Sequence, residues 1–138
     1  MKIWLVNTNI KDTNGNPNGY KQMLRQNKAA AFYDNKEKVD KIEPQDMVLL
    51  YHNNNRVIAV GFAINDEEHD FSDMSDIEHF VSVNWFWRAN FNEKFEPVNS
   101  INRNSIGIKM VNGTVLNITD HVDCRILLQE IAKRQNYF

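Results

Sequence analysis

The sequence has a single cysteine and no long apolar run, and both absences narrow what the chain can be. Cys124 stands alone among 138 residues, so neither an intramolecular disulfide nor a cysteine-based zinc site can form. No stretch approaches the roughly 18 apolar residues of a membrane-spanning helix, and the N-terminal apolar segment is too short for a signal peptide. We therefore expect a cytoplasmic protein in a reducing setting, with no membrane partner.

The chain also lacks an excess of positive charge. Its formal net charge is −2 and its sequence pI is about 6.1. Proteins that bind nucleic acid through many phosphates are usually basic, so these values argue against extended, non-specific binding. A small local contact surface remains compatible with them.

Recognisable catalytic motifs are missing as well. The four histidines have no metal-ligand spacing such as HExxH, and the chain holds no GxSxG or GxxxxGK[ST] segment. Cys124 falls on the apolar stripe of a predicted helix, where a buried, inert thiol is expected. We predict a protein that is not an enzyme and that holds no metal and no cofactor.

What the sequence does contain is a strong hairpin pattern in residues 46–64. Residues 47–51 and 57–64 are apolar runs, and an Asn triplet, Asn53-Asn54-Asn55, lies between them. Asparagine tolerates positive φ, so a triplet between β-rich runs predicts a turn. A second hairpin is predicted for residues 106–111 and 114–118, which flank Asn112-Gly113.

Other segments complete the predicted order. Strands are expected at residues 2–6, 29–33 and 78–88, and loops at residues 7–19, 66–76 and 89–105. Helical patterns occupy residues 20–28, one turn in 35–41, and a C-terminal segment with an N-cap at Thr119-Asp120 and an apolar stripe formed by Cys124, Leu127, Leu128 and Ile131. With no repeat and no linker, we predict one α+β domain over residues 1–138, a curled sheet or barrel with helices outside.

This order of segments resembles the PUA-like barrels called EVE and YTH domains. The resemblance covers most of the chain: KIWLV followed by Asn7-Thr8-Asn9, a helix before AAAFY, the VLLYH and VIAVG hairpin, the VNWFW strand, and Asn112-Gly113 before a last helix. It implies a PUA-like curled mixed β-barrel with peripheral helices, one of them C-terminal. The chain departs from the pattern after Gly61, where YTH domains supply a further cage Trp and residues 66–76 offer only Phe71.

The resemblance implies a nucleic-acid-binding domain that recognises a modified, flipped-out base in an aromatic pocket. Such a domain would be the specificity module of a restriction or defence system, with a separate nuclease or motor ATPase as its partner. Three alternatives stay open: an RNA-binding PUA-like domain in RNA modification or translation, a small enzyme acting on nucleic acid, and a protein-interaction domain without a nucleic-acid role.

Candidate base-pocket residues are aromatic and polar side chains at or near predicted strand ends: Asn7, Thr8, Asn9, Phe32, Tyr33, Tyr51, His52, Trp85 and Trp87. Trp85 and Trp87 share one face of a strand and form either barrel core or a pocket wall. The polar members either read a base edge or serve turns and structural hydrogen bonds. Candidate phosphate contacts, with solvated surface charge as the alternative, are Lys21, Arg25, Lys28, Arg88 and Arg103.

Overall fold

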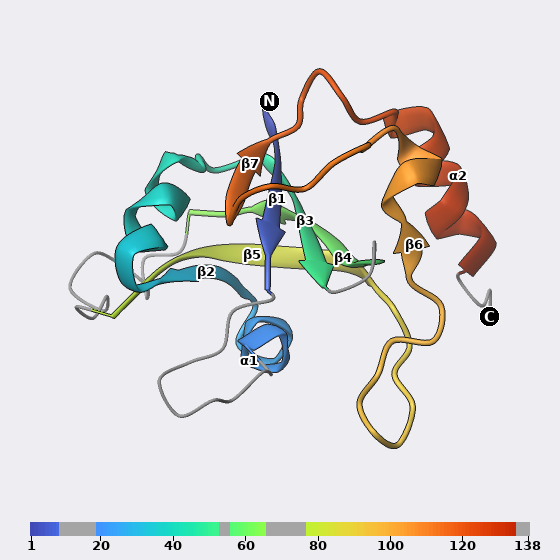
Figure 1. Ribbon diagram of the computed structural model, residues 1–138, viewed down its shortest axis with the longest axis horizontal. Helices are drawn as coiled ribbons and strands as arrows, with labels where there is room; N and C mark the ends of the chain where they lie inside the picture. Colours follow the sequence, from blue (N-terminus) through green and yellow to red (C-terminus); the bar gives the residue numbers. More distant parts are fainter. Residues whose placement is uncertain (9–18, 53–55, 66–76, 135–138) are drawn as a thin grey trace.

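The fold is built on one mixed sheet that curls strongly into a half-barrel (Figure 1). The computed structural model describes residues 1–8, 19–52, 56–65 and 77–134. Within them the strand order is β2-β5-β4-β3-β1-β7, and β6 pairs with β4 outside this path. The strands are β1 (Ile3–Asn7), β2 (Lys28–Phe32), β3 (Met47–His52), β4 (Arg56–Ala63), β5 (Glu78–Arg88), β6 (Ile101–Asn102) and β7 (Val115–Asn117). The expected curled α+β architecture with helices outside is therefore confirmed.

The predicted hairpin is present as β3 and β4, whose residues pair antiparallel from Met47↔Phe62 to His52↔Arg56. Its Asn triplet lies outside the described residues. On its other side β3 pairs with β1 in parallel, which places both strand ends together. Gly61 lies at a register shift between β4 and β5, and a Cβ there would come within 2.4 Å of the Asn84 carbonyl oxygen. Only glycine allows this close approach of the two strands.

The helices flank the sheet, with bounds that differ from the prediction. Helix α1 (Gly19–Arg25) is shorter than predicted, because Asn27 adopts a left-handed φ of 53° and Lys28 already begins β2. Where one helical turn is predicted, the 3₁₀ helix η1 (Tyr33–Lys41) follows β2. None of the helices in the described segments is long and apolar enough to cross a membrane.

The C-terminal helix α2 (Cys124–Arg134) begins later than the predicted cap at Thr119-Asp120. Its first turn is capped by Asp123, whose Oδ1 accepts a hydrogen bond from the Ile126 amide at 3.1 Å. Thr119 instead accepts a hydrogen bond from the Ile3 amide at 2.9 Å and so holds the start of β1. The predicted cap is wrong because a distant strand uses its hydroxyl.

The predicted hairpin around Asn112-Gly113 is also wrong. Residues 106–111 form no strand, and β7 pairs antiparallel with β1, for example Leu116 with Leu5. The open edge of β1 is the stronger partner because this pairing covers a buried strand. The predicted loop of residues 89–105 likewise holds β6 and the start of the 3₁₀ helix η3 (Arg103–Ile106).

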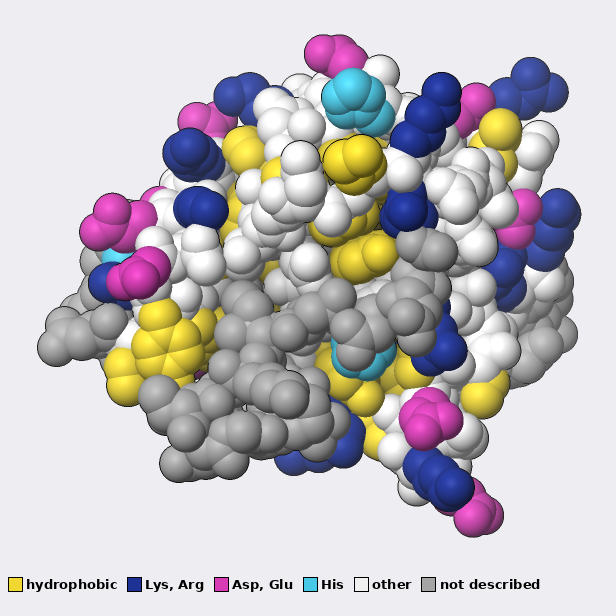
Figure 2. All heavy atoms as spheres, viewed as in Figure 1, with side chains coloured by type: hydrophobic (Ala, Val, Ile, Leu, Met, Phe, Trp, Pro, Cys, Tyr) yellow, Lys and Arg dark blue, Asp and Glu magenta, His cyan; other side chains and the backbone are white. Residues whose placement is uncertain are grey.

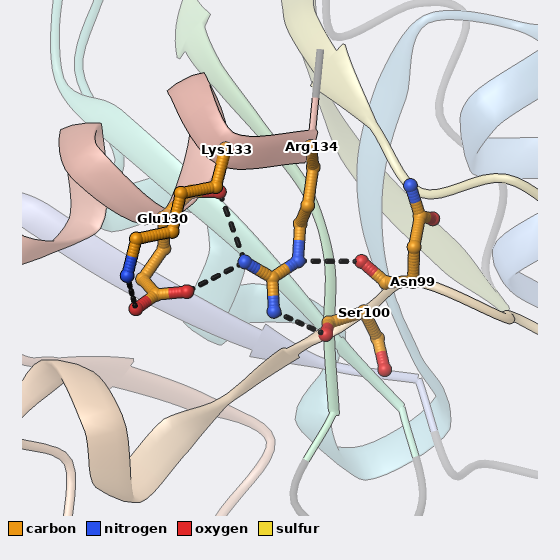
Figure 3. A network of polar contacts seen from close by, with 5 residues as sticks. All are labelled: Asn99, Ser100, Glu130, Lys133 and Arg134. Carbon is orange, nitrogen blue, oxygen red and sulfur yellow. Dashed lines mark hydrogen bonds and ion pairs between the residues drawn. The ribbon is translucent and has the colours of Figure 1, made fainter. Parts of the chain in front are cut away.

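Helix α2 is tied to the connection between β5 and β6 by Arg134 (Figure 3). Its Nε donates to the Asn99 carbonyl at 2.8 Å, and its other guanidinium nitrogens donate to the Ser100 carbonyl at 3.2 Å and to Glu130 Oε2 at 2.6 Å. Together with the Glu130 carbonyl, 2.9 Å from Nη1, three backbone carbonyls and a carboxylate fix the guanidinium in one geometry. This anchors the end of a connection whose first half contributes to the candidate site.

Candidate nucleotide-binding pocket

The two tryptophans predicted as possible pocket walls lie in the core. Trp85 and Trp87 are 8% and 4% exposed. They share one buried face of β5, and the Trp85 indole donates to the Met23 carbonyl of α1 at 3.2 Å. Alternation along the strand is as predicted, but the face with the tryptophans is the covered one. Neither side chain is placed to wall an accessible pocket.

Three of the predicted polar and aromatic residues do meet, at the ends of β1 and β3. The Thr8 hydroxyl donates to the Tyr51 carbonyl at 2.8 Å and lies 3.5 Å from Nδ1 of His52. Thr8 and Tyr51 are buried, whereas His52 is half-buried. Asn7 turns away from this group, since its side-chain amide donates to the Gly113 carbonyl at 3.3 Å. Asn9 lies outside the described residues.

Phe32 and Tyr33 lie apart from that group. Phe32 pairs with Glu78 at the start of β5, and the Tyr33 amide donates to the Ile77 carbonyl at 2.7 Å. The group at the ends of β1 and β3, which includes His52, lies near Arg88, and Arg88 is at the other end of β5 from Glu78. Eleven residues of β5 span roughly 35 Å, so one base cannot contact both groups. The predicted base-pocket residues therefore do not form a single pocket.

The predicted phosphate contacts separate in a similar way. Lys28 forms an ion pair with Glu78 and lies 5.0 Å from the Phe80 ring centre, and Arg103 donates to the Ile108 carbonyl at 2.8 Å. Lys21, Arg25 and Arg88 instead gather around one hollow of about 260 Å³. We call it the aromatic–basic pocket; its lining is Lys21, Leu24, Arg25, Arg88, Ala89, Phe91 and Phe95.

The pocket combines a stacked pair of rings with cations. Phe91 and Phe95 stack with centroids 4.8 Å apart and an angle of 16° between the rings. Lys21 Nζ lies 4.6 Å from the Phe95 centroid, within the range of a cation–π contact. Among the described residues none of the three cations forms an ion pair, although Arg88 donates to the side-chain oxygen of Asn27 at 3.0 Å. The pocket therefore offers positive charge to an outside anion.

Two elements build the pocket, and Figure 1 shows both below the sheet: α1 and the connection after β5. In α1 the i, i+4 spacing puts Lys21 and Arg25 on one face. Figure 2 shows dark-blue basic, yellow hydrophobic and magenta acidic side chains along this lower edge of the molecule. Two of the three basic groups, Lys21 and Arg25, thus stand on a helix that is anchored by buried Tyr20, Met23 and Leu24.

The connection forms a tight turn around Asn92. Its side-chain oxygen accepts hydrogen bonds from the amides of Lys94 and Glu96, both at 2.9 Å, and Phe91 bridges to Pro97. This turn holds Phe95 at φ 59°, a conformation that a bulky residue rarely adopts. Backbone strain of this kind persists where the surroundings enforce it and is common at functional sites.

Tyr20 links the aromatic–basic pocket to the group at the ends of β1 and β3. Its hydroxyl donates to the Phe95 carbonyl at 2.7 Å, and its ring lies 4.4 Å from the His52 ring. Burial is the main cause that raises the pKa of Tyr20, and the negative charge of Glu96 is the second. Burial, followed by the charge of Arg56, lowers the pKa of His52, which favours a neutral imidazole. A column of rings therefore runs from His52 through Tyr20 to Phe91 and Phe95.

A second hollow, of about 530 Å³, lies near β7 and is lined by Gly107, Ile108, Lys109, Met110, Ile118, Asp120 and His121. It is larger, but the described residues of its lining include one lysine beside an aspartate, and among them only His121 has a ring. A stacked base needs flat π-surfaces, and phosphate needs excess positive charge. The aromatic–basic pocket meets both needs and the second hollow does not. Among the described residues no group of three or more His, Cys, Asp or Glu is placed to hold a metal ion.

Sequence reasoning missed Tyr20, Phe91 and Phe95 as site residues. Residues 89–105 read as an irregular connection, and Tyr20 as part of an apolar helix stripe. The available signal was the segment FNEKF, in which two aromatics flank an asparagine able to cap a turn.

Comparison with known proteins does not identify a family. No protein-family model matches the chain, and no curated protein sequence matches it either.

Proposed function

We propose that this chain is a PUA-like domain of the EVE/YTH type that binds nucleic acid and holds one flipped-out base in the aromatic–basic pocket. Its role would be to supply the specificity of a restriction or defence system, with a separate nuclease or motor ATPase as its partner. The order of strands and helices, with a parallel β1–β3 pair inside a curled sheet, supports this proposal at the level of architecture.

The observation that carries the proposal is the gathering of three cations around one stacked aromatic pair. Arg25 and Arg88 are exposed and Lys21 is half-buried, so their charged ends can reach a phosphate. Phe91 and Phe95 are half-buried, and in this proposal a base stacks on the part of the ring pair that stays exposed. A pocket of about 260 Å³ lies just below the roughly 300 Å³ at which drug-sized ligand sites begin, which suits a single base.

The charge of the chain sets the kind of binding expected. With a net charge of −2, the protein can make few phosphate contacts beyond these three side chains. For single strands each neutralised phosphate contributes about −0.7 to the slope of log K against log salt concentration, so the expected slope is about −2. Shape and stacking must then supply most of the selectivity.

Fluorescence anisotropy with labelled single-stranded oligonucleotides tests the proposal. Wild-type protein should bind, and Arg25→Gln should weaken binding and reduce the salt slope by about 0.7. Arg125→Gln is the matched control, because Arg125 is also exposed, lies on α2 and is not part of the pocket lining. Equal loss in both variants, or no binding by the wild type, would contradict the proposal.

The same titration distinguishes modified from plain bases. Oligonucleotides carrying 5-methylcytosine, 5-hydroxymethylcytosine or 6-methyladenine are compared with unmodified ones, in DNA and in RNA. A buried methyl group contributes roughly 0.8 kcal/mol, which is about fourfold in affinity. One modified oligonucleotide should exceed its plain control by at least that factor. Equal affinity for all would remove the base-reading part of the proposal.

A further inference from the structure

A second aromatic pair lies on the face of the sheet opposite to Trp85 and Trp87. Phe62 of β4 and Phe86 of β5 stack with ring centroids 5.3 Å apart. They are 37% and 38% exposed, although phenylalanine is usually buried. The pair is formed by strand register, since Phe62 pairs with Asn84, two residues before Phe86 on the same face of β5.

Arg88 connects this aromatic pair to the aromatic–basic pocket along β5. Asn84, Phe86 and Arg88 alternate along one face of β5, all of them exposed. Arg88 also lines the pocket, so this residue belongs both to the pocket and to the strand face that carries Phe86. On β5 the side chains from Asn84 to Arg88 on this face include an amide, a ring and a guanidinium, and no carboxylate.

We infer that Phe62 and Phe86 form a second stacking surface, which binds the single-stranded nucleic acid that flanks the base held in the pocket. This inference rests on the proposed function and adds to it the path of the strand. Aromatic rings on a sheet surface stack successive bases without regard to sequence, and an arginine between two such surfaces pairs with the intervening phosphate. The asparagine beside the rings adds hydrogen-bonding capacity for base edges.

A single strand fits this surface better than a duplex does. Stacking on Phe62 and Phe86 requires exposed base faces, which a duplex keeps inside its own stack. The exposed Ile64, 42% accessible, extends the apolar surface beyond Phe62. An apolar extension of this kind is also typical of contacts between proteins, and the experiment below includes that outcome.

Affinity as a function of oligonucleotide length tests the inference. Wild-type protein is titrated with oligonucleotides of about three and about twelve nucleotides, the longer covering both surfaces. The variant Phe62→Thr/Phe86→Thr keeps strand propensity and should bind the short oligonucleotide as wild type does. Its affinity for the long one should fall at least roughly fivefold, the lower end of stacking on one base. Phe62→Tyr/Phe86→Tyr keeps the rings and should retain the long-oligonucleotide affinity.

The control variant is Val98→Thr/Met110→Thr, which removes exposed apolar side chains, 60% and 71% accessible, outside the helices and strands. It should bind both oligonucleotides normally.

Three outcomes would overturn the inference. If the wild type binds and the Phe→Thr variant binds both oligonucleotides equally well, Phe62 and Phe86 do not contact the strand, and the proposed pocket stands. If wild type binds neither, the proposed function fails and the inference with it. If wild type self-associates in light scattering and the Phe→Thr variant does not, the surface is a contact between copies and the inference is overturned.

Discussion

Trp4 donates a hydrogen bond from its indole nitrogen to Oδ2 of Asp46 at 2.9 Å, and both side chains are buried. The same carboxylate accepts hydrogen bonds from the backbone amides of Lys2 and Glu43, both at 3.0 Å. Burial alone raises the pKa of Asp46, but these backbone and indole donors outweigh it, so that the pKa lies below 3.8. One buried acid therefore joins the first strand to the turn that starts the β3–β4 hairpin.

Replacing Asp46 with Asn should destabilise the fold. An amide presents one acceptor oxygen, so at least one of the three donors stays unsatisfied, at a cost of roughly 1–3 kcal/mol of unfolding free energy. Urea denaturation at neutral pH measures this difference. An unchanged midpoint would show that the carboxylate is not needed.

The pH dependence of that loss has a definite sign. Because the pKa of Asp46 is lower in the folded state, its carboxylate stabilises the fold above the unfolded pKa of about 3.8. The contribution disappears as the pH falls through the lower, folded pKa. The stability difference between wild type and Asp46→Asn should therefore shrink in acid, and a constant difference from pH 7 to pH 2 would contradict the assigned cause.

Gly61→Ala should disturb the β4–β5 pairing. Its Cβ would lie 2.4 Å from the Asn84 carbonyl oxygen and 2.7 Å from Val83 Cγ1, neither of which can move freely. We expect a loss of roughly 1–3 kcal/mol, as for other overpacked sites. Gly19→Ala is the control, because nothing lies within 4 Å of its Cβ position, and it should melt at or above the wild-type temperature. Equal melting of the two variants would refute the steric argument.

Trp85→Ala should cost roughly 3–5 kcal/mol of stability, because the ring is buried and its indole is hydrogen-bonded. Phe91→Ala should cost less, since its ring is half-exposed at the pocket rim, and should instead weaken oligonucleotide binding. Thermal melting and anisotropy on both variants separate core from site. If Trp85→Ala is as stable as wild type but no longer binds the oligonucleotide, Trp85 is a binding residue and not part of the core.

The strands with strong periodicity were predictable from the sequence, and the site was not. The β3–β4 hairpin and β5 follow from alternating or continuous apolar runs between turn residues. Alternation placed Trp85 and Trp87 on one face but could not tell which face of β5 is buried. Asn112-Gly113 failed as a hairpin because β7 pairs with β1 over a long sequence separation.

The pocket could not be predicted from the sequence because the residues that form it are distant in the chain. Tyr20 and Phe95 are 75 residues apart, and their hydrogen bond exists only once α1 and the turn around Asn92 meet. The basic side chains were predicted, and three of five proved to be neighbours. The sequence could not show which three, because this depends on contacts between distant segments. In the fold Lys28 forms an ion pair with Glu78, and Arg103 donates to a backbone carbonyl.

His52 should titrate below its usual pKa of 6.5. Burial is the main cause and the charge of Arg56 the second, so Arg56→Gln should raise the pKa part of the way back. An NMR titration of the imidazole protons measures both values. If Arg56→Gln leaves the midpoint unchanged, the charge has no part in the shift.

The most direct test of the account is an assigned amide NMR spectrum recorded while a single-stranded oligonucleotide is added. The largest shifts should fall on Lys21, Arg25, Ala89, Phe91 and Phe95, which line the aromatic–basic pocket. They should shrink in Arg25→Gln and persist in Arg125→Gln. Shifts concentrated at Gly107, Ile108 and His121, which line the larger hollow, or no shifts at any oligonucleotide concentration, would contradict it.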